Sequence, residues 1–228
     1  LEQEPETIFD PINDMFFLLF TRSNPTVGQR INIHDVSSLH ASNWRSSSGV
    51  RFLIHGWGSS SNSGENPRTR DEFLRLADHN VVVVDWSVGA GAANYITARN
   101  RVGPAGAVVG QFIDWLTSLG VTHPSRVNIV GISLGAHVSG HAGKNTHSGQ
   151  VNAIFGNDPA GPLFNVDNPD RLDIGDAYYT EGMHTNVGQL GFDLPITHAT
   201  FYPNWGGAQP GKTFFLLKNR TILVEIIL

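Results

Sequence analysis

The chain has 228 residues, of which 40% are hydrophobic and 15% charged, and its formal net charge is −5. This length is sufficient for a single domain, residues 1–228, with a full hydrophobic core. The negative charge argues against a nucleic-acid partner, and no run of about 18 apolar residues predicts a membrane span. The chain contains no cysteine, which excludes disulfides, thiol catalysis and thiolate metal sites.

Short apolar segments predict the first strands of a sheet. An irregular acidic lead-in over residues 1–14 precedes a strand at 15–20, and a second short strand is expected near 30–33. Val50–Ile54 predicts a buried strand that runs into a loop rich in serine and glycine. After this loop, apolar residues at helical spacing predict a helix over 69–79.

The second half of the pattern alternates between strands and helices. Four valines within residues 81–86 are typical of a strand buried on both faces, and residues 107–119 have helical spacing. A strand at Val127–Ile132, a helix at Leu134–Lys144 and a strand at 151–155 follow. This alternation predicts an α/β fold with a mostly parallel sheet and helices on both faces.

Residues 131–135 fit the pattern G-x-S-x-G, with Ser133 at its centre. In this pattern a strand turns sharply into a helix, the serine is exposed above the sheet edge, and the glycines let neighbouring backbone pass close by. The strand predicted before Ser133 and the helix predicted after it supply the context that the pattern requires. The sequence therefore predicts a nucleophilic serine, with the N–H of Leu134 placed to stabilise an oxyanion.

Two further segments favour the same chemistry. Asp158 follows the next predicted strand, at the edge where α/β sheets place their sites, although the same residues are also typical of a plain Asp-Pro turn. A glycine-containing loop, His55-Gly56-Trp57, leaves an early strand. Such a loop can supply the second oxyanion N–H, here from Trp57.

A serine nucleophile also needs a base, which in this fold is a histidine that follows the acid in the sequence. The last histidines of the chain are His184 and His198, which makes them candidates for a substitute base. His137 and His141 lie four residues apart in the helix after Ser133, and hydrogen bonding within a packed helix is expected of them. No histidine pair has metal-ligand spacing with a carboxylate partner, so neither a metal nor a cofactor is expected.

Six motifs together resemble a known family. In chain order they are Leu53-Ile54-His55-Gly56-Trp57, Val83-Val84-Asp85-Trp86, Gly131-Ile132-Ser133-Leu134-Gly135-Ala136-His137, Asp158-Pro159-Ala160-Gly161-Pro162-Leu163-Phe164, Gly182-Met183-His184-Thr185-Asn186 and His198-Ala199-Thr200-Phe201-Tyr202-Pro203-Asn204. Over roughly residues 10–211 the chain closely resembles the neutral, pancreatic-type lipases. That family includes insect lipases, venom phospholipases of the A1 class and the lipase-derived yolk proteins of flies.

The resemblance implies an α/β-hydrolase fold and specific roles. The nucleophile of the family falls on Ser133, its acid on Asp158, and its oxyanion donors on Trp57 and Leu134. His184 and His198 match positions that are structural in the family, so neither corresponds to the family's base. Secretion is a further expectation from the family.

The end of the sequence departs from the family. There a cysteine follows the segment matching 209–211, and a lid loop and the catalytic histidine come after it. Here Lys212 replaces the cysteine, and residues 213–228 contain neither a histidine nor a lid. Ile132 also replaces a histidine before the nucleophile, a change that is tolerable. Loss of the base is not, since it costs a factor on the order of a million in one triad.

Two hypotheses follow. The first is a catalytically impaired lipase homologue that binds or stores a lipid or another apolar ligand. The second is an active secreted ester hydrolase, a triacylglycerol lipase or a phospholipase of the A1 class, whose base this sequence does not show. Contact with a lipid surface is expected in either case. The apolar tail at 222–228 predicts an edge strand, or a dimer formed through strand pairing.

Overall fold

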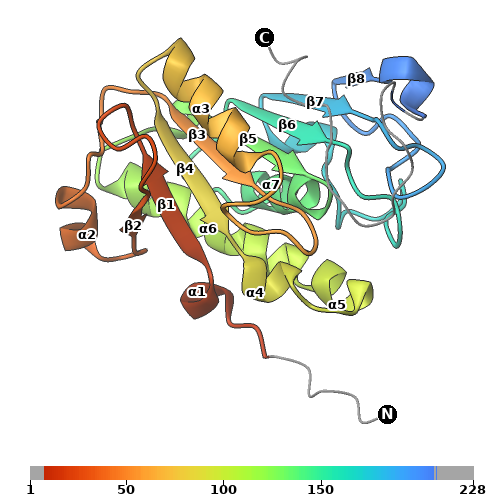
Figure 1. Ribbon diagram of the computed structural model, residues 1–228, viewed down its shortest axis with the longest axis horizontal. Helices are drawn as coiled ribbons and strands as arrows, with labels where there is room; N and C mark the ends of the chain where they lie inside the picture. The colour runs from red at the N-terminus through yellow and green to blue at the C-terminus, as the bar shows by residue number, and fades with distance from the viewer. Residues whose placement is uncertain (1–7, 208, 210–228) are drawn as a thin grey trace.

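The computed structural model describes residues 8–207 and 209. Within these residues, eight strands form one sheet in the order β2-β1-β4-β3-β5-β6-β7-β8 (Figure 1). The strands are β1 (Phe16–Phe20), β2 (Gln29–Ile31), β3 (Val50–Ile54), β4 (Asn80–Asp85), β5 (Val127–Ile132), β6 (Ala153–Asn157), β7 (Tyr179–Met183) and β8 (Ala199–Phe201). Strand β1 is antiparallel to β2 and β4, and every other pairing is parallel.

Helices cover both faces of this sheet (Figure 1). They are α1 (Pro11–Asp14), α2 (Val36–His40), α3 (Asn66–Leu76), α4 (Ser87–Ala90), α5 (Tyr95–Asn100), α6 (Val102–Ser118) and α7 (Leu134–Lys144). Helices α6 and α7 pack together on one face, and α3 packs on the other. The mostly parallel sheet between helical layers confirms the predicted α/β-hydrolase fold class.

The alternation of side chains in β3 explains the two layers. Phe52 and Ile54 belong to the large core under α6, whereas Leu53 belongs to the smaller core under α3. The ring of Phe112 in α6 lies edge-on to Phe52 and stacks on Phe17 with ring centroids 3.9 Å apart. Successive strand residues face opposite sides of a sheet, so a strand covered on both faces is apolar throughout. All six residues of β4 are buried, as its run of valines predicted.

Some boundaries differ from the prediction for identifiable reasons. Residues 107–119 are the clearest part of the predicted helix, and α6 begins earlier, at Val102, with Gly106 in its interior. A Cβ there would lie 2.3 Å from the Cβ of His141, so the glycine permits the close approach of α6 and α7. Helix α3 begins and ends three residues early, and β6 lies two residues late.

The sequence did not predict β7, β8 and the short helices α1 and α2, because they are too short or too polar for a periodic pattern. Helices α4 and α5 lie in the helical region that the sequence predicts between residues 86 and 119. The predicted apolar tail at 222–228, with its edge strand or dimer contact, lies outside the described residues. Over the residues that are described, helices fall short of the length and apolar character needed to cross a membrane.

Candidate active site

Ser133 stands between β5 and α7, at the carboxyl end of a central strand. Its backbone has φ 56° and ψ −122°, a conformation that costs a non-glycine residue about 1–3 kcal/mol. Its N–H donates to the carbonyl of Asn157 at 3.0 Å, and its carbonyl accepts from the N–H of Ala136. These bonds hold the strained turn and leave the Ser133 side chain partly exposed.

The two glycines of the motif serve close packing. Neither Gly131 nor Gly135 has a positive φ. A Cβ on Gly131 would lie 2.2 Å from the carbonyl oxygen of Gly135, and a Cβ on Gly135 would lie 2.3 Å from the carbonyl oxygen of Ile54. A side chain at Gly131 would push α7 away from β5, and a side chain at Gly135 would push α7 away from β3, so either would displace the serine between them.

The loop after β3 lies directly against Ser133. A Cβ on Gly56 would come within 2.9 Å of the Ser133 Cβ and 3.4 Å of its Oγ. The next N–H belongs to Trp57, and among the described residues it donates no hydrogen bond. Leu134 is the first residue of α7, where a backbone N–H has no partner within the helix. Both predicted oxyanion donors therefore flank the serine with their N–H groups available.

Buried polar groups keep this loop in place. The Trp86 N–H donates to His55 Nε2 at 3.1 Å, so His55 Nδ1 carries the proton and donates to the carbonyl of Gly56 at 3.0 Å. Although burial raises the pKa of Asp85, hydrogen bonds from the N–H groups of Ser61 and Ser87 outweigh it and hold that pKa well below its usual range. A residue outside the loop holds the Trp57 side chain, because the Nε1–H of Trp57 donates to the carbonyl of Ala92 at 2.8 Å.

Asp158 begins the turn after β6, beside the serine. Ile132 pairs with Asn157 in the sheet, so Ser133 and Asp158 leave adjacent strands at the same level. Asp158 has φ 46°, and its Oδ1 accepts from the N–H of Thr185 at 2.9 Å. Burial raises the pKa of Asp158 above its usual value, and hydrogen bonds from Thr185 oppose this.

His184 lies near the acid but faces elsewhere. It follows β7, whose last carbonyl, that of Met183, accepts from the Asp158 N–H at 2.6 Å. Its Nδ1–H donates to the carbonyl of Phe192, and its buried Nε2 has no partner among the described residues. Burial lowers the pKa of the His184 imidazole. No hydrogen bond joins His184 to Ser133 or Asp158 in the described part of the chain.

The structure does not bring His198 to the serine. His198 precedes β8 and accepts at Nδ1 from the N–H of Thr180 at 3.1 Å. Through the parallel registers, Thr180 lies level with Ile129 of β5, four residues before Ser133. At about 3.3 Å per residue, this is roughly 13 Å along the strand direction, and β8 lies three strands from β5.

The family model described as Lipase matches residues 5–225. The chain belongs to the lipase family.

Curated relatives agree with the family. Phospholipase A1 member A of mouse is 38% identical over 204 residues, covering 87% of this chain and 43% of the relative. Lipase member H of rabbit is 37% identical over 205 residues, covering 87% and 43%. The chain spans less than half the length of these relatives. Among solved structures, the α/β hydrolase MGS-M1 from a deep-sea metagenome aligns with a TM-score of 0.44 and 14% identity, over 82% of this chain and 81% of that one.

Two residues that support the candidate site, Thr185 and His137, have no such role predicted from the sequence. Thr185, which donates to Asp158, follows a strand too short and polar to be predicted. His137 was expected to bond within its helix. Instead its ring bonds to the loop after Asp158, at the carbonyl of Ala160 and the N–H of Leu172. A buried polar ring must find partners somewhere, but only the folded chain shows which.

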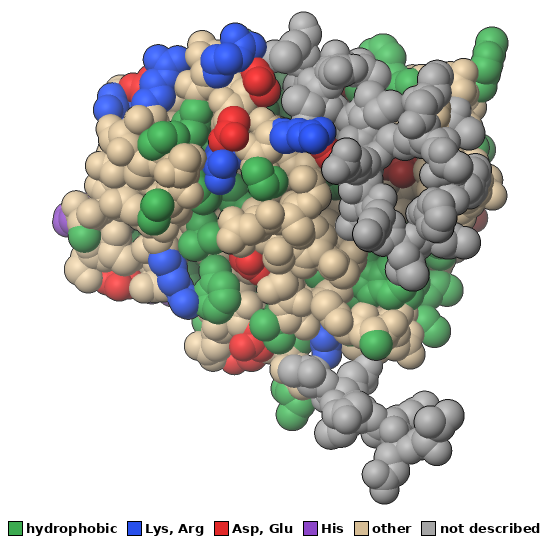
Figure 2. Space-filling model, in the orientation of Figure 1, with side chains coloured by type: hydrophobic (Ala, Val, Ile, Leu, Met, Phe, Trp, Pro, Cys, Tyr) green, Lys and Arg blue, Asp and Glu red, His purple; other side chains and the backbone are tan. Residues whose placement is uncertain are grey.

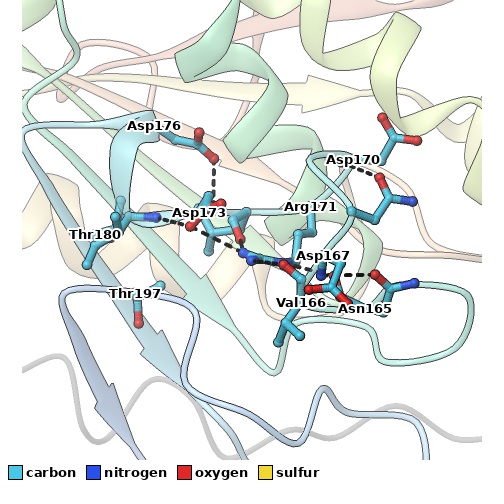
Figure 3. A network of polar contacts seen from close by, with 12 residues as sticks. Asn165, Val166, Asp167, Asp170, Arg171, Asp173, Asp176, Thr180 and Thr197 are labelled. Carbon is cyan, nitrogen blue, oxygen red and sulfur yellow. Dashed lines mark hydrogen bonds and ion pairs between the residues drawn. The ribbon is translucent and has the colours of Figure 1, made fainter.

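The loop that follows the acid is held from within by one arginine. Arg171 donates to the carbonyls of Asn165, Val166 and Leu172, which closes the loop around its guanidinium (Figure 3). At the loop's far end, Lys144 at the end of α7 forms an ion pair with Asp176. Burial raises the pKa of Asp176 to about 6, and Lys144 opposes the rise. The loop after Asp158 is therefore held by polar contacts both within it and at its far end.

Proposed function

We propose that this chain carries the site of a serine hydrolase for lipid esters, with Ser133 as nucleophile, Asp158 as the acid that orients a base, and the N–H groups of Trp57 and Leu134 as the oxyanion hole. The backbone of Ser133 carries the proposal. Strain at a non-glycine residue with φ 56° persists where the surroundings enforce it, and such residues cluster at active sites.

The proposed reaction is acyl transfer to the serine. Ser133 Oγ attacks the ester carbonyl while a base takes its proton, and the two N–H groups stabilise the oxyanion. Collapse of this intermediate expels the alcohol, which receives the proton from the base. Water then releases the acid by the same route.

We also propose that the 228 residues by themselves react slowly. Among the described residues no hydrogen bond joins a histidine side chain to the side chain of Ser133 or Asp158, and the sequence has no histidine after His198. A serine hydroxyl is a weak nucleophile without a base. The oxyanion hole and binding alone leave roughly 10³–10⁴ over water in a triad enzyme. A chain that binds lipid and hydrolyses its ester only slowly combines the two hypotheses drawn from the sequence.

A lipid ester is proposed as the substrate because of the relatives' names and the surface of the site. Exposed hydrophobic side chains that follow the carboxyl ends of the parallel strands are Trp57, Leu163, Val166, Leu190, Leu194 and Trp205. The Gly161 N–H donates to the carbonyl of Leu190 at 2.8 Å, which joins two of these loops. Figure 2 shows hydrophobic side chains at the lower right, on the side toward which the parallel strands run, and Lys and Arg at the upper left.

This apolar rim favours contact with a lipid surface rather than with a water-soluble ester. Extracellular action is part of the same proposal, because the family members that the sequence resembles act in venom, gut and yolk. Release of fatty acid from phosphatidylcholine vesicles and from tributyrin emulsions would separate a phospholipase from a triacylglycerol lipase.

Labelling of Ser133 by a fluorophosphonate tests the proposed site. The serine oxygen bonds to phosphorus, fluoride leaves, and a base takes the proton. We expect slow labelling of the 228-residue chain and an acceleration of at least about tenfold by added imidazole, which can act as the missing base. Ser133→Ala should show no labelling in either condition, with the same thermal unfolding.

Each outcome decides something different. No labelling with or without imidazole would overturn the hydrolase site and leave an apolar-ligand scaffold. Rapid labelling without imidazole would mean that the chain supplies its own base. In that case His184→Gln should slow labelling if His184 is that base.

A further inference from the structure

His137 joins the two halves of the candidate active site. It lies on α7, four residues after Ser133, and its side chain is fully buried. Its Nδ1 accepts from the N–H of Leu172 at 3.0 Å, so the proton is on Nε2, which donates to the carbonyl of Ala160 at 2.8 Å. One ring therefore holds both ends of the segment 160–172, which follows the acid.

Both backbone groups of Ala160, its N–H and its carbonyl, form hydrogen bonds to residues at the start of this helix. Its N–H reaches the carbonyl of Ser133 at 3.4 Å, and its carbonyl accepts from His137. The turn that carries Asp158 thus meets the nucleophile's own backbone at one point and the nucleophile's own helix at another. Within an α-helix the distance between residues four apart is constant, so His137 sets the Asp158 turn at a defined height above Ser133.

The ring itself is held on its outer side. Phe164 stacks on His137 with ring centroids 3.9 Å apart, and the guanidinium of Arg99 lies 4.7 Å from the centroid of Phe164. Arg99 also donates to the carbonyl of Leu163 at 3.3 Å. This stack holds the imidazole in one orientation. A fixed orientation favours its two hydrogen bonds, because hydrogen bonds weaken steeply when donor and acceptor are misaligned.

We propose that His137 is a positioning residue that keeps Asp158 aligned with Ser133. Further hydrogen bonds join the turn to Met183 at the end of β7 and to Thr185, Leu190 and Phe192 in the segment between β7 and β8. Those bonds fix the turn to β7 and the segment after it, whereas the side chain of His137 fixes the turn to the helix that follows the nucleophile. This role rests on the proposed hydrolase site.

Two substitutions of similar shape each keep one of the two hydrogen bonds of the His137 ring and remove the other. The amide of Gln in His137→Gln reaches the position of Nε2 and can donate to Ala160. The amide of Asn in His137→Asn reaches the position of Nδ1 and can accept only from Leu172. Thr146→Val is the control, because it removes a buried side-chain hydrogen bond from the end of the same helix, at 2.8 Å to Ala142.

The measurements are the imidazole-assisted labelling rate at saturating fluorophosphonate and amide hydrogen exchange in residues 158–172. We expect His137→Asn to label at least about tenfold more slowly, since small misplacements of reacting groups are costly, with the half-saturating probe concentration unchanged. Exchange in 158–172 should rise in this variant. Thr146→Val should match the wild-type chain in both measurements. His137→Gln should match it in labelling rate and in the exchange of residues 158–161, while the N–H of Leu172, which loses its acceptor, exchanges faster.

Equal exchange in all variants would overturn the positioning role. Faster exchange in His137→Asn with an unchanged labelling rate would also overturn it, because His137 would then be structural only. If the wild-type chain is not labelled even with imidazole, the proposed function fails instead. Hydrogen exchange alone then decides whether His137 holds the turn.

Discussion

The turns after β5 and β6 resemble one another in backbone but differ in what supports them. Ser133 and Asp158 both have positive φ, 56° and 46°. The Ser133 turn is supported largely by its own motif, through glycines that let β5 and β3 lie close to α7. The Asp158 turn is held by residues far along the chain, such as Thr185 and His137. Strain can therefore be enforced by local packing or by distant polar contacts.

The largest effect is expected from a substitution of Asp158, which should change the labelling rate without lowering the stability of the fold. Asp158→Asn should lower the imidazole-assisted labelling rate by on the order of 10²–10⁴, as loss of the acid does in a triad. Its stability at pH 7 should not fall, because burial raises the pKa of Asp158 and so disfavours its charged form in the folded chain. Labelling rate and urea unfolding are the two measurements. An unchanged labelling rate would contradict the role of the acid.

A substitution in the first turn should act through folding. Gly135→Ala places a Cβ 2.3 Å from the carbonyl oxygen of Ile54, and overpacking against backbone costs about 3 kcal/mol. Gly175→Ala is the matched control, since a Cβ there would meet nothing within 4 Å. We expect urea unfolding to show a large loss of stability for the first variant and less than about 0.5 kcal/mol for the second. Similar stabilities would remove the packing argument for the motif.

The pH dependence of stability probes the distant support. Burial lowers the pKa of His137 to about 3, whereas an unfolded histidine has a pKa of about 6.5. Between these values the unfolded chain binds a proton at this residue and the folded chain does not, so stability falls as the pH falls. At about 1.4 kcal/mol per pH unit, this residue accounts for roughly 2 kcal/mol between pH 7 and pH 5.

His137→Gln should remove that share of the pH dependence, while Thr146→Val should keep it. Urea unfolding at the two pH values measures the difference. The half-buried His141 and the buried His184, whose pKa values burial also lowers, contribute equally to the pH dependence of all three chains. An identical loss of stability in His137→Gln and the wild-type chain would contradict the prediction.

The smallest effect is expected at the oxyanion loop. Trp57→Phe keeps the backbone N–H that faces the serine and removes the bond from Nε1 to Ala92. One such exposed hydrogen bond contributes about 1 kcal/mol or less. Labelling should stay within about threefold of the wild-type rate. A much larger loss would mean that the side chain, rather than the N–H, acts at the site.

The sequence by itself determined the features that depend on neighbouring residues. The run of valines predicts a strand buried on both faces, and the pattern at 131–135 predicts the turn around Ser133, because both signals are local. The edge position of Asp158 followed from the order of strands along the chain. The six motifs were enough to indicate the lipase family and the α/β-hydrolase fold.

Only the tertiary structure decided the features that depend on distant partners. Thr185 follows a strand stabilised by its neighbours in the sheet, so its contact with Asp158 has no local signal. The register of β8 places His198 away from the serine, although its position in the sequence made it a candidate base. Helical spacing places His137 and His141 on one side of the helix and predicts bonds within it. The buried ring of His137 instead forms its hydrogen bonds with the loop after Asp158. Such contacts arise between segments that only the folded chain brings together.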